Sequence, residues 1–143
     1  MDLSSVYTEI IAEHNKSGRN KKHLANPTIT LQGRNPSCGD EISLELKVKD
    51  NIIQDASFTG VGCAISQAST SMMIDLVRGQ TVATAQTLIN TFLGMIKREI
   101  TDDDELEILD EAIALKNISN LPARVKCAVL SWHTLENAIH SKA

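Results

Sequence analysis

The 143-residue sequence is poor in aromatic residues, proline and cysteine, and it contains no long apolar run. Aromatic residues make up 3% of the chain, so aliphatic side chains, alanine and methionine must build the hydrophobic core. No apolar run approaches the roughly 18 residues that a membrane-spanning helix needs. The amino-terminal residues 1–5 have neither the basic nor the apolar region of a signal peptide. These absences predict a cytoplasmic protein that does not enter a membrane.

An excess of positive charge is also missing, because the formal net charge is −4. Proteins that bind nucleic acids or anionic membranes generally present a basic surface, so the composition argues against both kinds of partner. With 42% hydrophobic and 22% charged residues, the composition is that of an ordinary globular protein. A chain of this length can bury a core without disulfide bonds. We therefore expect a single domain that spans residues 1–143.

Cysteine is scarce, and the three thiols of Cys38, Cys63 and Cys127 cannot all pair in internal disulfide bonds because their number is odd. In a reducing cytosol such thiols are buried, reactive or bound to a metal. A single cysteine is often simply buried in the core without any further role. Here each cysteine lies beside glycine, proline or a charged residue and not inside an apolar run, which favours a reactive or metal-binding role.

Alternation of polar and apolar residues predicts strands in the first half of the chain. A helix over about residues 4–16 comes first, and a short β-branched strand over residues 28–32 follows and ends at Gly33. Residues 41–49 alternate almost without error, and residues 52–60 return as their partner strand after a tight turn. These segments predict an antiparallel meander of three strands.

Helical spacing of apolar residues replaces the strand pattern after Cys63. It continues to a stop at Gly79, and residues 80–99 form one or two further helices. A last helix is predicted to begin near Pro122, since proline is tolerated in a first turn. Strands followed by helices predict an α+β fold, with the helices packed on one face of a three-stranded antiparallel sheet.

An acidic segment, residues 102–105, precedes the last helix. Its spacing matches no calcium loop, because the glycine and the distal ligand of such loops are missing. Acidic side chains favour the positive start of a helix. The segment is therefore predicted to begin a helix that turns Leu106, Leu109 and Ile113 inward.

Asp40 and the three cysteines together form a set of soft, anionic metal ligands. Gly39 separates Cys38 from Asp40 and permits the sharp backbone path that lets both side chains reach one ion. Cys63 lies where the last strand should end and a helix should begin, and Cys127 lies near the start of the last helix. Four such ligands can close a tetrahedral site, which we interpret as a zinc site.

Three thiolates and one carboxylate leave an excess negative charge at this site, and Arg124 and Lys126 flank Cys127 to balance it. A carboxylate suits harder ions better than a thiolate does, so Asp40 makes the ligation of a soft ion replaceable. A thiolate that is released from the metal can attack the outer sulfur of a persulfide. The pattern is therefore interpreted as a zinc site in which one thiolate also accepts sulfur.

At these residues the sequence resembles the SufU branch of the IscU-like (NifU amino-terminal) iron–sulfur cluster assembly family. The resemblance covers nearly the whole chain. Its motifs are Tyr7…His14…Arg19-Asn20, Asn35-Pro36-Ser37-Cys38-Gly39-Asp40, Gly60-Val61-Gly62-Cys63-Ala64-Ile65-Ser66-Gln67-Ala68-Ser69, and Arg124-Val125-Lys126-Cys127-Ala128 followed by Leu130 and Trp132. The family implies an α+β fold, zinc or an iron–sulfur cluster bound by the three cysteines and the aspartate, and a cysteine desulfurase partner that contains pyridoxal phosphate.

Two features distinguish the sequence from the IscU branch of that family. Lys126 stands where IscU-type scaffolds carry a histidine, and extra helical sequence covers part of residues 87–116. Both are SufU-type features and favour a zinc-dependent sulfur acceptor over a cluster scaffold. The resemblance implies that Cys38 is released from zinc when a desulfurase histidine takes its place, and that Cys38 is then the persulfide carrier.

By the same resemblance, Asp40, Cys63 and Cys127 keep the metal, and Arg124 is the charge partner of the opened site. The first hypothesis is thus a sulfurtransferase-type protein that accepts sulfur from a SufS-type cysteine desulfurase and passes it to downstream iron–sulfur scaffold proteins. The second is a scaffold that builds a [2Fe–2S] cluster on the same ligands, since thiolates bind either ion. The third is an interaction module whose zinc is only structural.

Overall fold

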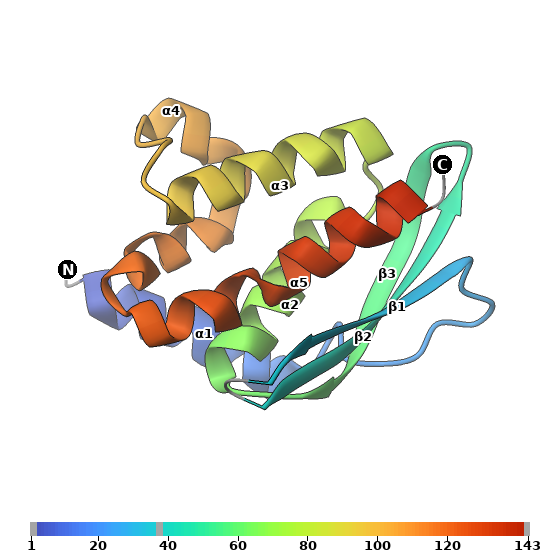
Figure 1. Cartoon of the computed structure of the whole chain (residues 1–143), viewed down its shortest axis with the longest axis horizontal. Coiled ribbons are helices and arrows are strands. Elements are labelled where there is room, and N and C mark those ends of the chain that lie inside the picture. Colours follow the sequence, from blue (N-terminus) through green and yellow to red (C-terminus); the bar gives the residue numbers. More distant parts are fainter. Residues whose placement is uncertain (1–2, 37–38, 142–143) are drawn as a thin grey trace.

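The structure is a computed structural model that describes residues 3–36 and 39–141. A sheet and a layer of helices lie against each other (Figure 1). The elements in chain order are α1 (Leu3–Ser17), β1 (Ile29–Asn35), β2 (Asp40–Lys49), β3 (Ile52–Val61), α2 (Ala64–Val77), α3 (Val82–Ile96), α4 (Asp103–Leu106), the 3-10 helix η1 (Glu107–Asn120) and α5 (Pro122–Ser141). The predicted α+β class is confirmed.

The sheet is the predicted antiparallel meander in the order β1-β2-β3. Asp50 and Asn51 join β2 to β3 with φ of 54° and 62°. Positive φ at both central residues is typical of the two-residue turn that matches the twist of a hairpin. The turn sets Lys49 opposite Ile52, and an irregularity between Lys47 and Val48 then shifts the register by one residue, so that Glu41 at the start of β2 faces Val61 at the end of β3.

The first strand is longer than predicted, because β1 continues through Gly33 to Asn35. Gly33 is buried beneath α5, where a Cβ would overlap Oγ1 of Thr134. The glycine thus permits a helix to approach the strand closely and does not end the strand.

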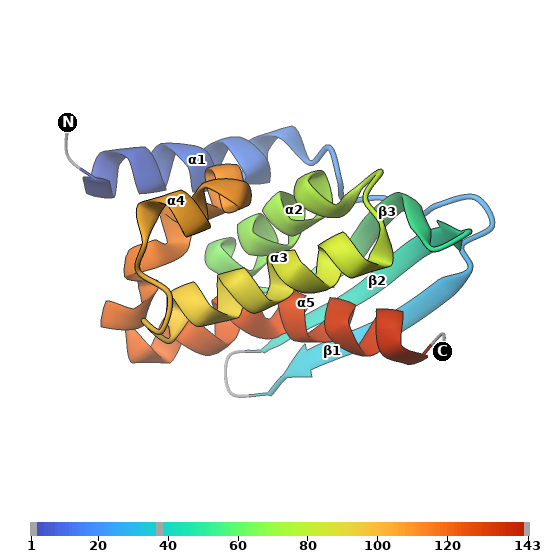
Figure 2. The ribbon, with the colours of Figure 1, turned by 90° about the horizontal axis from the view of Figure 1, so that it is seen from above.

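Figure 2 shows the helices gathered on one side of the sheet, with α1 on the outer side of α2. Helix α5 contacts β1 and β2, and α2 contacts β3 and α5. One hydrophobic cluster fills the space between the layers. At its centre Trp132 stacks on Phe92 with ring centroids 4.1 Å apart, and its indole N–H donates to Oγ of Ser69 at 3.0 Å. No helix in the described part of the chain is long and apolar enough to cross a membrane.

The acidic segment begins a helix as predicted, and Asp102 caps it by accepting a hydrogen bond from the Asp104 N–H at 3.0 Å. The segment is not one regular α-helix, because α4 ends at Leu106 and the 3-10 helix η1 follows with a break at Asp110. The buried residues recur at every third position, the period of a 3-10 helix, and Ile113 is only half-buried. They are Leu106, Leu109, Ala112, Leu115 and Ile118.

Residues 18–27 form a strap that pairs with β3 at Lys21 and contacts β2 through Leu24. The strap lies on the face of the sheet that does not carry the core residues Leu44 and Leu46. Glu45 is buried beneath the strap, where its carboxylate accepts hydrogen bonds from the Leu24 N–H at 2.8 Å and from Nδ1 of His23 at 2.6 Å. Side chains alternate between the two faces of a strand, so Glu45 points away from the main core. The carboxylate is thus the anchor of the strap.

We expect this anchor to weaken in acid. Burial raises the pKa of Glu45, but the Leu24 amide and His23 lower it, and the net shift is downward. Since the folded-state pKa lies below the unfolded value of about 4.3, Glu45 stabilises the fold above that pH and loses this contribution as the pH falls through its folded pKa. In urea unfolding of the metal-free protein, Glu45→Gln should cost stability near neutral pH, and its difference from wild type should shrink in acid.

Glu41→Gln is the matched control, because Glu41 lies exposed on the same face of β2. Its difference from wild type should be small at every pH. A Glu45→Gln curve that runs parallel to wild type from neutral to acidic pH would show that Glu45 does not anchor the strap through its charge.

Candidate metal centre

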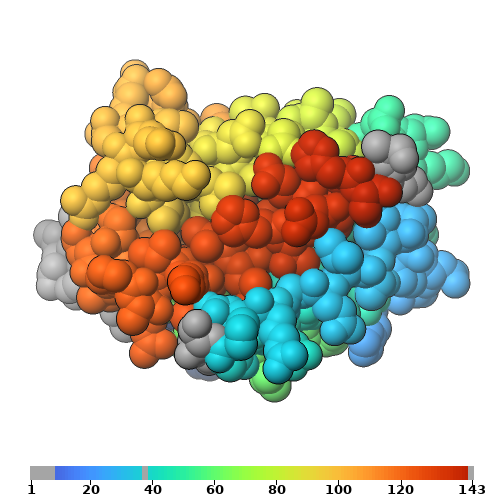
Figure 3. Space-filling model, in the orientation of Figure 1, coloured from blue at the N-terminus to red at the C-terminus, as the bar shows by residue number. Residues whose placement is uncertain are grey.

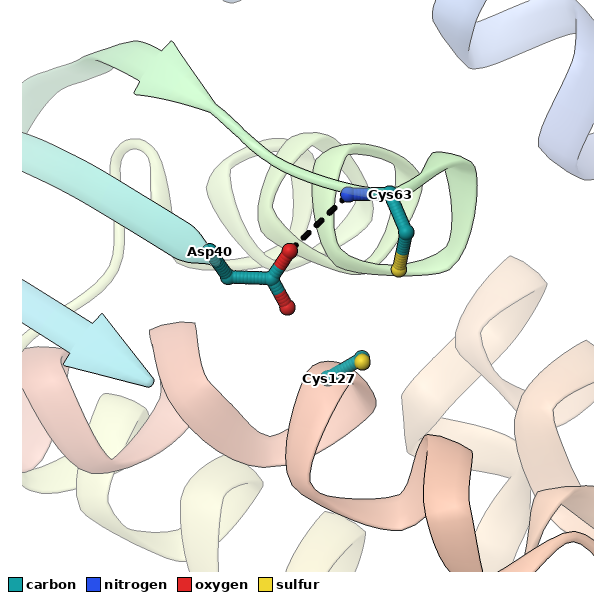
Figure 4. Close-up of side chains that lie close together, drawn as sticks. All are labelled: Asp40, Cys63 and Cys127. Atoms are coloured by element: carbon teal, nitrogen blue, oxygen red, sulfur yellow. Dashed lines mark hydrogen bonds between the residues drawn. The ribbon is translucent and has the colours of Figure 1, made fainter. Parts of the chain in front are cut away.

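Asp40, Cys63 and Cys127 lie close together although they are far apart in the sequence (Figure 4). A carboxylate oxygen of Asp40 and the two Sγ atoms are all within 4.8 Å of one another. Asp40 begins β2, Cys63 follows β3 and caps α2, and Cys127 lies in the second turn of α5. Side chains from three separate parts of the fold can therefore bind one ion.

The pairing of β2 with β3 explains why Asp40 and Cys63 meet. The backbone N–H of Cys63 donates to Oδ1 of Asp40 at 2.9 Å, and the Cys63 Sγ accepts from the Ser66 N–H at 3.5 Å, as a helix cap does. Gly62 makes this approach possible, since a Cβ at that position would lie 2.5 Å from Oδ1 of Asp40. Backbone hydrogen bonds within the protein thus orient the carboxylate and the thiol without a bound ion.

Burial and charge at this position fit a metal site. Asp40 and Cys127 are 0% and 1% exposed, and Cys63 is half-buried. Anionic groups are costly to bury unless a cation or hydrogen bonds compensate them. Two thiols and a carboxylate are a donor set that Zn²⁺ binds in tetrahedral sites, and a fourth ligand would complete the shell. Cys38, the predicted fourth ligand, lies outside the described residues.

Arg124 lies at the exposed side of the centre. Its guanidinium hydrogen-bonds to Cys127, and this bond together with the charges of Cys63 and Cys127 raises the pKa of Arg124 above its ordinary value. Arg124 precedes Cys127 by three residues on α5, a spacing that places two side chains on the same side of a helix. The cation that the sequence predicted as a charge partner is therefore beside the two thiols. Both Arg124 and Lys126 are exposed to solvent.

Figure 3 shows the beginning of α5 (orange) at the surface next to the strands of the sheet. The side chains of Asp40 and Cys127 themselves are buried. The centre thus lies just beneath the surface at the junction of sheet and helices.

A second group, made of His14, Asp75 and Glu111, also has ligand atoms within 4.8 Å of one another. Nη2 of Arg19 lies among them, 2.8 Å from Oδ2 of Asp75, 3.3 Å from Nε2 of His14 and 3.9 Å from Oε1 of Glu111. Burial raises the pKa of Asp75, but hydrogen bonds from Arg19 and Asn20 lower it by more than burial raises it. The net shift is downward, so the carboxylate stays charged. A guanidinium already serves as the cation here, and the group is an ion-pair network that joins α1, α2 and η1.

Sequence reasoning did not single out this network or Gln67, whose side chain lies near Gly62 beside the candidate metal centre. The residues of the network are separated by long stretches of chain, and no local pattern brings them together. His14 is buried and has a hydrogen-bond partner on each ring nitrogen, Ser71 on Nδ1 and Glu111 on Nε2.

Comparison with known proteins gives the same assignment along most of the chain. A family model described as the NifU-like N terminal domain matches residues 6–142. The chain is 40% identical over 138 residues to the zinc-dependent sulfurtransferase SufU of Bacillus subtilis, with 96% of this chain and 92% of that protein covered. It is 39% identical over 139 residues to the iron–sulfur cluster assembly scaffold protein IscU of Thermotoga maritima, with 97% and 96% covered.

A solved structure agrees with the sequence comparison. The crystal structure of a candidate iron–sulfur cluster assembly scaffold protein for the SUF system, from Fervidobacterium islandicum, matches with a TM-score of 0.87 and 35% identity. The match covers 94% of this chain and 97% of that one. The chain therefore belongs to the NifU-like N-terminal domain family, and the resemblance to its SufU branch that the sequence predicted is confirmed.

Proposed function

We propose that the protein is a zinc-dependent sulfur carrier in iron–sulfur cluster assembly. It accepts a persulfide sulfur from a cysteine desulfurase of the SufS type in the cytoplasm and passes it to a downstream scaffold protein. The observation that carries this proposal is the convergence of Asp40, Cys63 and Cys127 beside Arg124. The similarity to the Bacillus subtilis zinc-dependent sulfurtransferase SufU supports it.

Asp40, Cys63 and Cys127 would hold the zinc ion together with Cys38. Bound zinc keeps its thiol ligands deprotonated at neutral pH. The Cys63 N–H orients the carboxylate of Asp40, and α5 holds Cys127 in the buried core. Cys38 precedes Asp40 by two residues, so chain geometry keeps their Cα atoms within about 7 Å of each other.

Cys38 is the carrier in this proposal, as the resemblance to the SufU branch implies, and the fold holds the other two thiols in place. Cys127 is 1% exposed within α5, and Cys63 caps α2. In the transfer step the Cys38 thiolate attacks the outer sulfur of the desulfurase persulfide. A new S–S bond forms on Cys38, the S–S bond of the donor breaks, and the desulfurase cysteine leaves as a thiolate. Arg124 would offset the negative charge of the thiolates during this exchange.

The test is the Cys38→Ser variant incubated with a cysteine desulfurase and cysteine. Wild type should gain the mass of one sulfur atom in intact mass spectrometry and should stimulate the desulfurase. Cys38→Ser should gain no sulfur and should leave desulfurase turnover at the level seen without this protein. Ser37→Ala, a change at the neighbouring position, should behave as wild type. A persulfide that still forms on Cys38→Ser would contradict the carrier role.

A cluster scaffold is the second candidate function, and the similarity to the Thermotoga maritima scaffold protein IscU favours it. The same thiolates can bind a [2Fe–2S] cluster in place of zinc. Anaerobic purification with metal analysis and an absorption spectrum separates the two functions. Stoichiometric zinc without a visible iron–sulfide band supports sulfur transfer, and iron with that band supports the scaffold. If the zinc is purely structural, Cys38→Ser should still stimulate the desulfurase as wild type does.

A further inference from the structure

Gln67 presents a carboxamide that is buried without a partner next to the candidate metal centre. It lies one turn beyond Cys63, and its backbone N–H donates to the Cys63 carbonyl at 3.1 Å. Its side-chain atoms Nε2 and Oε1 are inaccessible to solvent, and neither makes a hydrogen bond to the part of the chain that the structure describes. A buried amide without a hydrogen bond is destabilising, and its presence calls for a physical reason.

The carboxamide and the Asp40 carboxylate lie on the same side of Gly62. The position that a Cβ on Gly62 would take is 2.5 Å from Oδ1 of Asp40 and 3.3 Å from Nε2 of Gln67. Long side chains on a helix point back toward its amino terminus, and this direction brings Gln67 toward the strand end that carries the centre. The unpaired amide is therefore directed at the surroundings of a predicted metal ligand.

Space for a small movement of Gln67 exists beside it. A cavity of about 280 Å³ lies between α1 and the start of α2, and Gln67 lines it together with Gly62, Ala64, Asn20 and Ser71. The side chain therefore has free space on one side and is not locked in place by close packing all round.

We propose that Gln67 is a positioning residue for Asp40 in the metal-loaded centre. Its amide donates a second hydrogen bond to Oδ1, the oxygen that already accepts from the Cys63 N–H, so that Oδ2 stays directed at the ion. A carboxylate oxygen can accept two such bonds. Carboxylates that bind metals are generally held by hydrogen bonds of this kind, and losing one weakens metal binding by about 10- to 100-fold. This inference rests on the metal binding in the proposed function but not on the sulfur-transfer step.

The test compares wild type with Gln67→Met, which keeps the length of the side chain and removes its hydrogen bonds. Zinc affinity, measured by competition with a chelator, should fall about 10- to 100-fold. The melting temperature of the metal-free protein should stay the same or rise, because an unpaired buried amide is replaced by an apolar group. The gap between the metal-loaded and metal-free melting temperatures should therefore shrink. A merely structural role would lower both melting temperatures alike and leave this gap unchanged.

Two further variants sharpen the result. Gln54→Met changes an exposed glutamine of β3 and should leave zinc affinity unchanged. In protein loaded with Co²⁺, the absorption bands of the metal should shift for Gln67→Met and not for Gln54→Met. Gln67→Leu replaces Gln67→Met in the same measurements if the latter folds poorly.

Zinc affinity of Gln67→Met within about twofold of wild type, with unchanged cobalt bands, would overturn the inference, since the expected loss is at least about tenfold. Failure of this inference differs from failure of the proposed function. A persulfide on Cys38→Ser would reject the carrier role and leave the role of Gln67 intact. Wild-type protein that binds no zinc or cobalt would reject the metal centre and the inference together.

Discussion

Cys127→Ala is expected to weaken zinc binding by more than about 100-fold, because a residue that merely orients a metal ligand already contributes about 10- to 100-fold. The Cys127 Sγ is one of three ligand atoms that converge from different elements, and its side chain is 1% exposed. Alanine is the best helix former, so the change should preserve α5. Zinc content after dialysis and chelator competition measure the loss, and circular dichroism reports the fold.

Ser131→Ala is the matched control for Cys127→Ala. Ser131 lies one turn farther along α5, is also 1% exposed, and its hydroxyl has no hydrogen-bond partner in the described residues. Its replacement should leave zinc binding unchanged and should not reduce stability, because a buried hydroxyl without a partner is removed. Stoichiometric zinc with wild-type affinity in Cys127→Ala would show that the ligand set is wrong.

Gly60→Ala is expected to destabilise the metal-free protein by about 2–4 kcal/mol, since a strained backbone and an overpacked contact each cost about 1–3 kcal/mol. Gly60 has a φ of 135°, which side-chain-bearing residues rarely adopt. A Cβ there would overlap the carbonyl oxygen of Glu41 and lie 2.9 Å from Cα of Ile42. The clash is with backbone in the paired strand, so no side-chain rotation relieves it. Urea unfolding of the metal-free protein measures the loss.

Gly18→Ala separates the two causes of that loss. Gly18 also has a positive φ, 57°, but a Cβ there would meet nothing within 4 Å. Only the backbone penalty of about 1–2 kcal/mol should remain. If both variants lose the same free energy of unfolding, the overlap with the β2 backbone at Gly60 does not contribute to the destabilisation.

The sheet could be predicted from the sequence because its signals are local. Residues 41–49 alternate with the period of a strand, and Asp50-Asn51 suits the tight turn that follows. The start of α2 could also be predicted from the sequence, since Cys63 follows Gly60 and Gly62 and precedes a helical pattern. Gly33 shows the limit of such reasoning, because a glycine that ends a strand and one that admits a neighbouring helix look the same in sequence.

The 3-10 segment could have been found from its spacing. Apolar residues recur at every third position from Leu106 to Ile118, whereas an α-helical period was assumed when Ile113 was expected to face inward. The ion pairs of His14 and Arg19 with Asp75 and Glu111 had no such signal. They depend on how three helices pack, and a single sequence does not contain that information.

The candidate metal centre was predicted because its residue types are rare and chemically distinctive. Asp40, Cys63 and Cys127 were expected to converge, and they do. The expected proximity of Arg124 to the thiols also appears in the structure. Gln67 gave no signal, because a glutamine in a helix is ordinary until its amide is found buried without a partner. The metal ligation itself and the role of Cys38 stay predictions.

The hydrogen bond from the Cys63 amide to Asp40 has a consequence for how the protein exchanges its ion. This bond does not involve the ion, and it ties the beginning of β2 to the beginning of α2. Departure of the ion therefore leaves two of the three ligand-bearing segments fastened to each other. Two of the ligands are therefore held near each other without an ion, which reduces the rearrangement that metal binding requires.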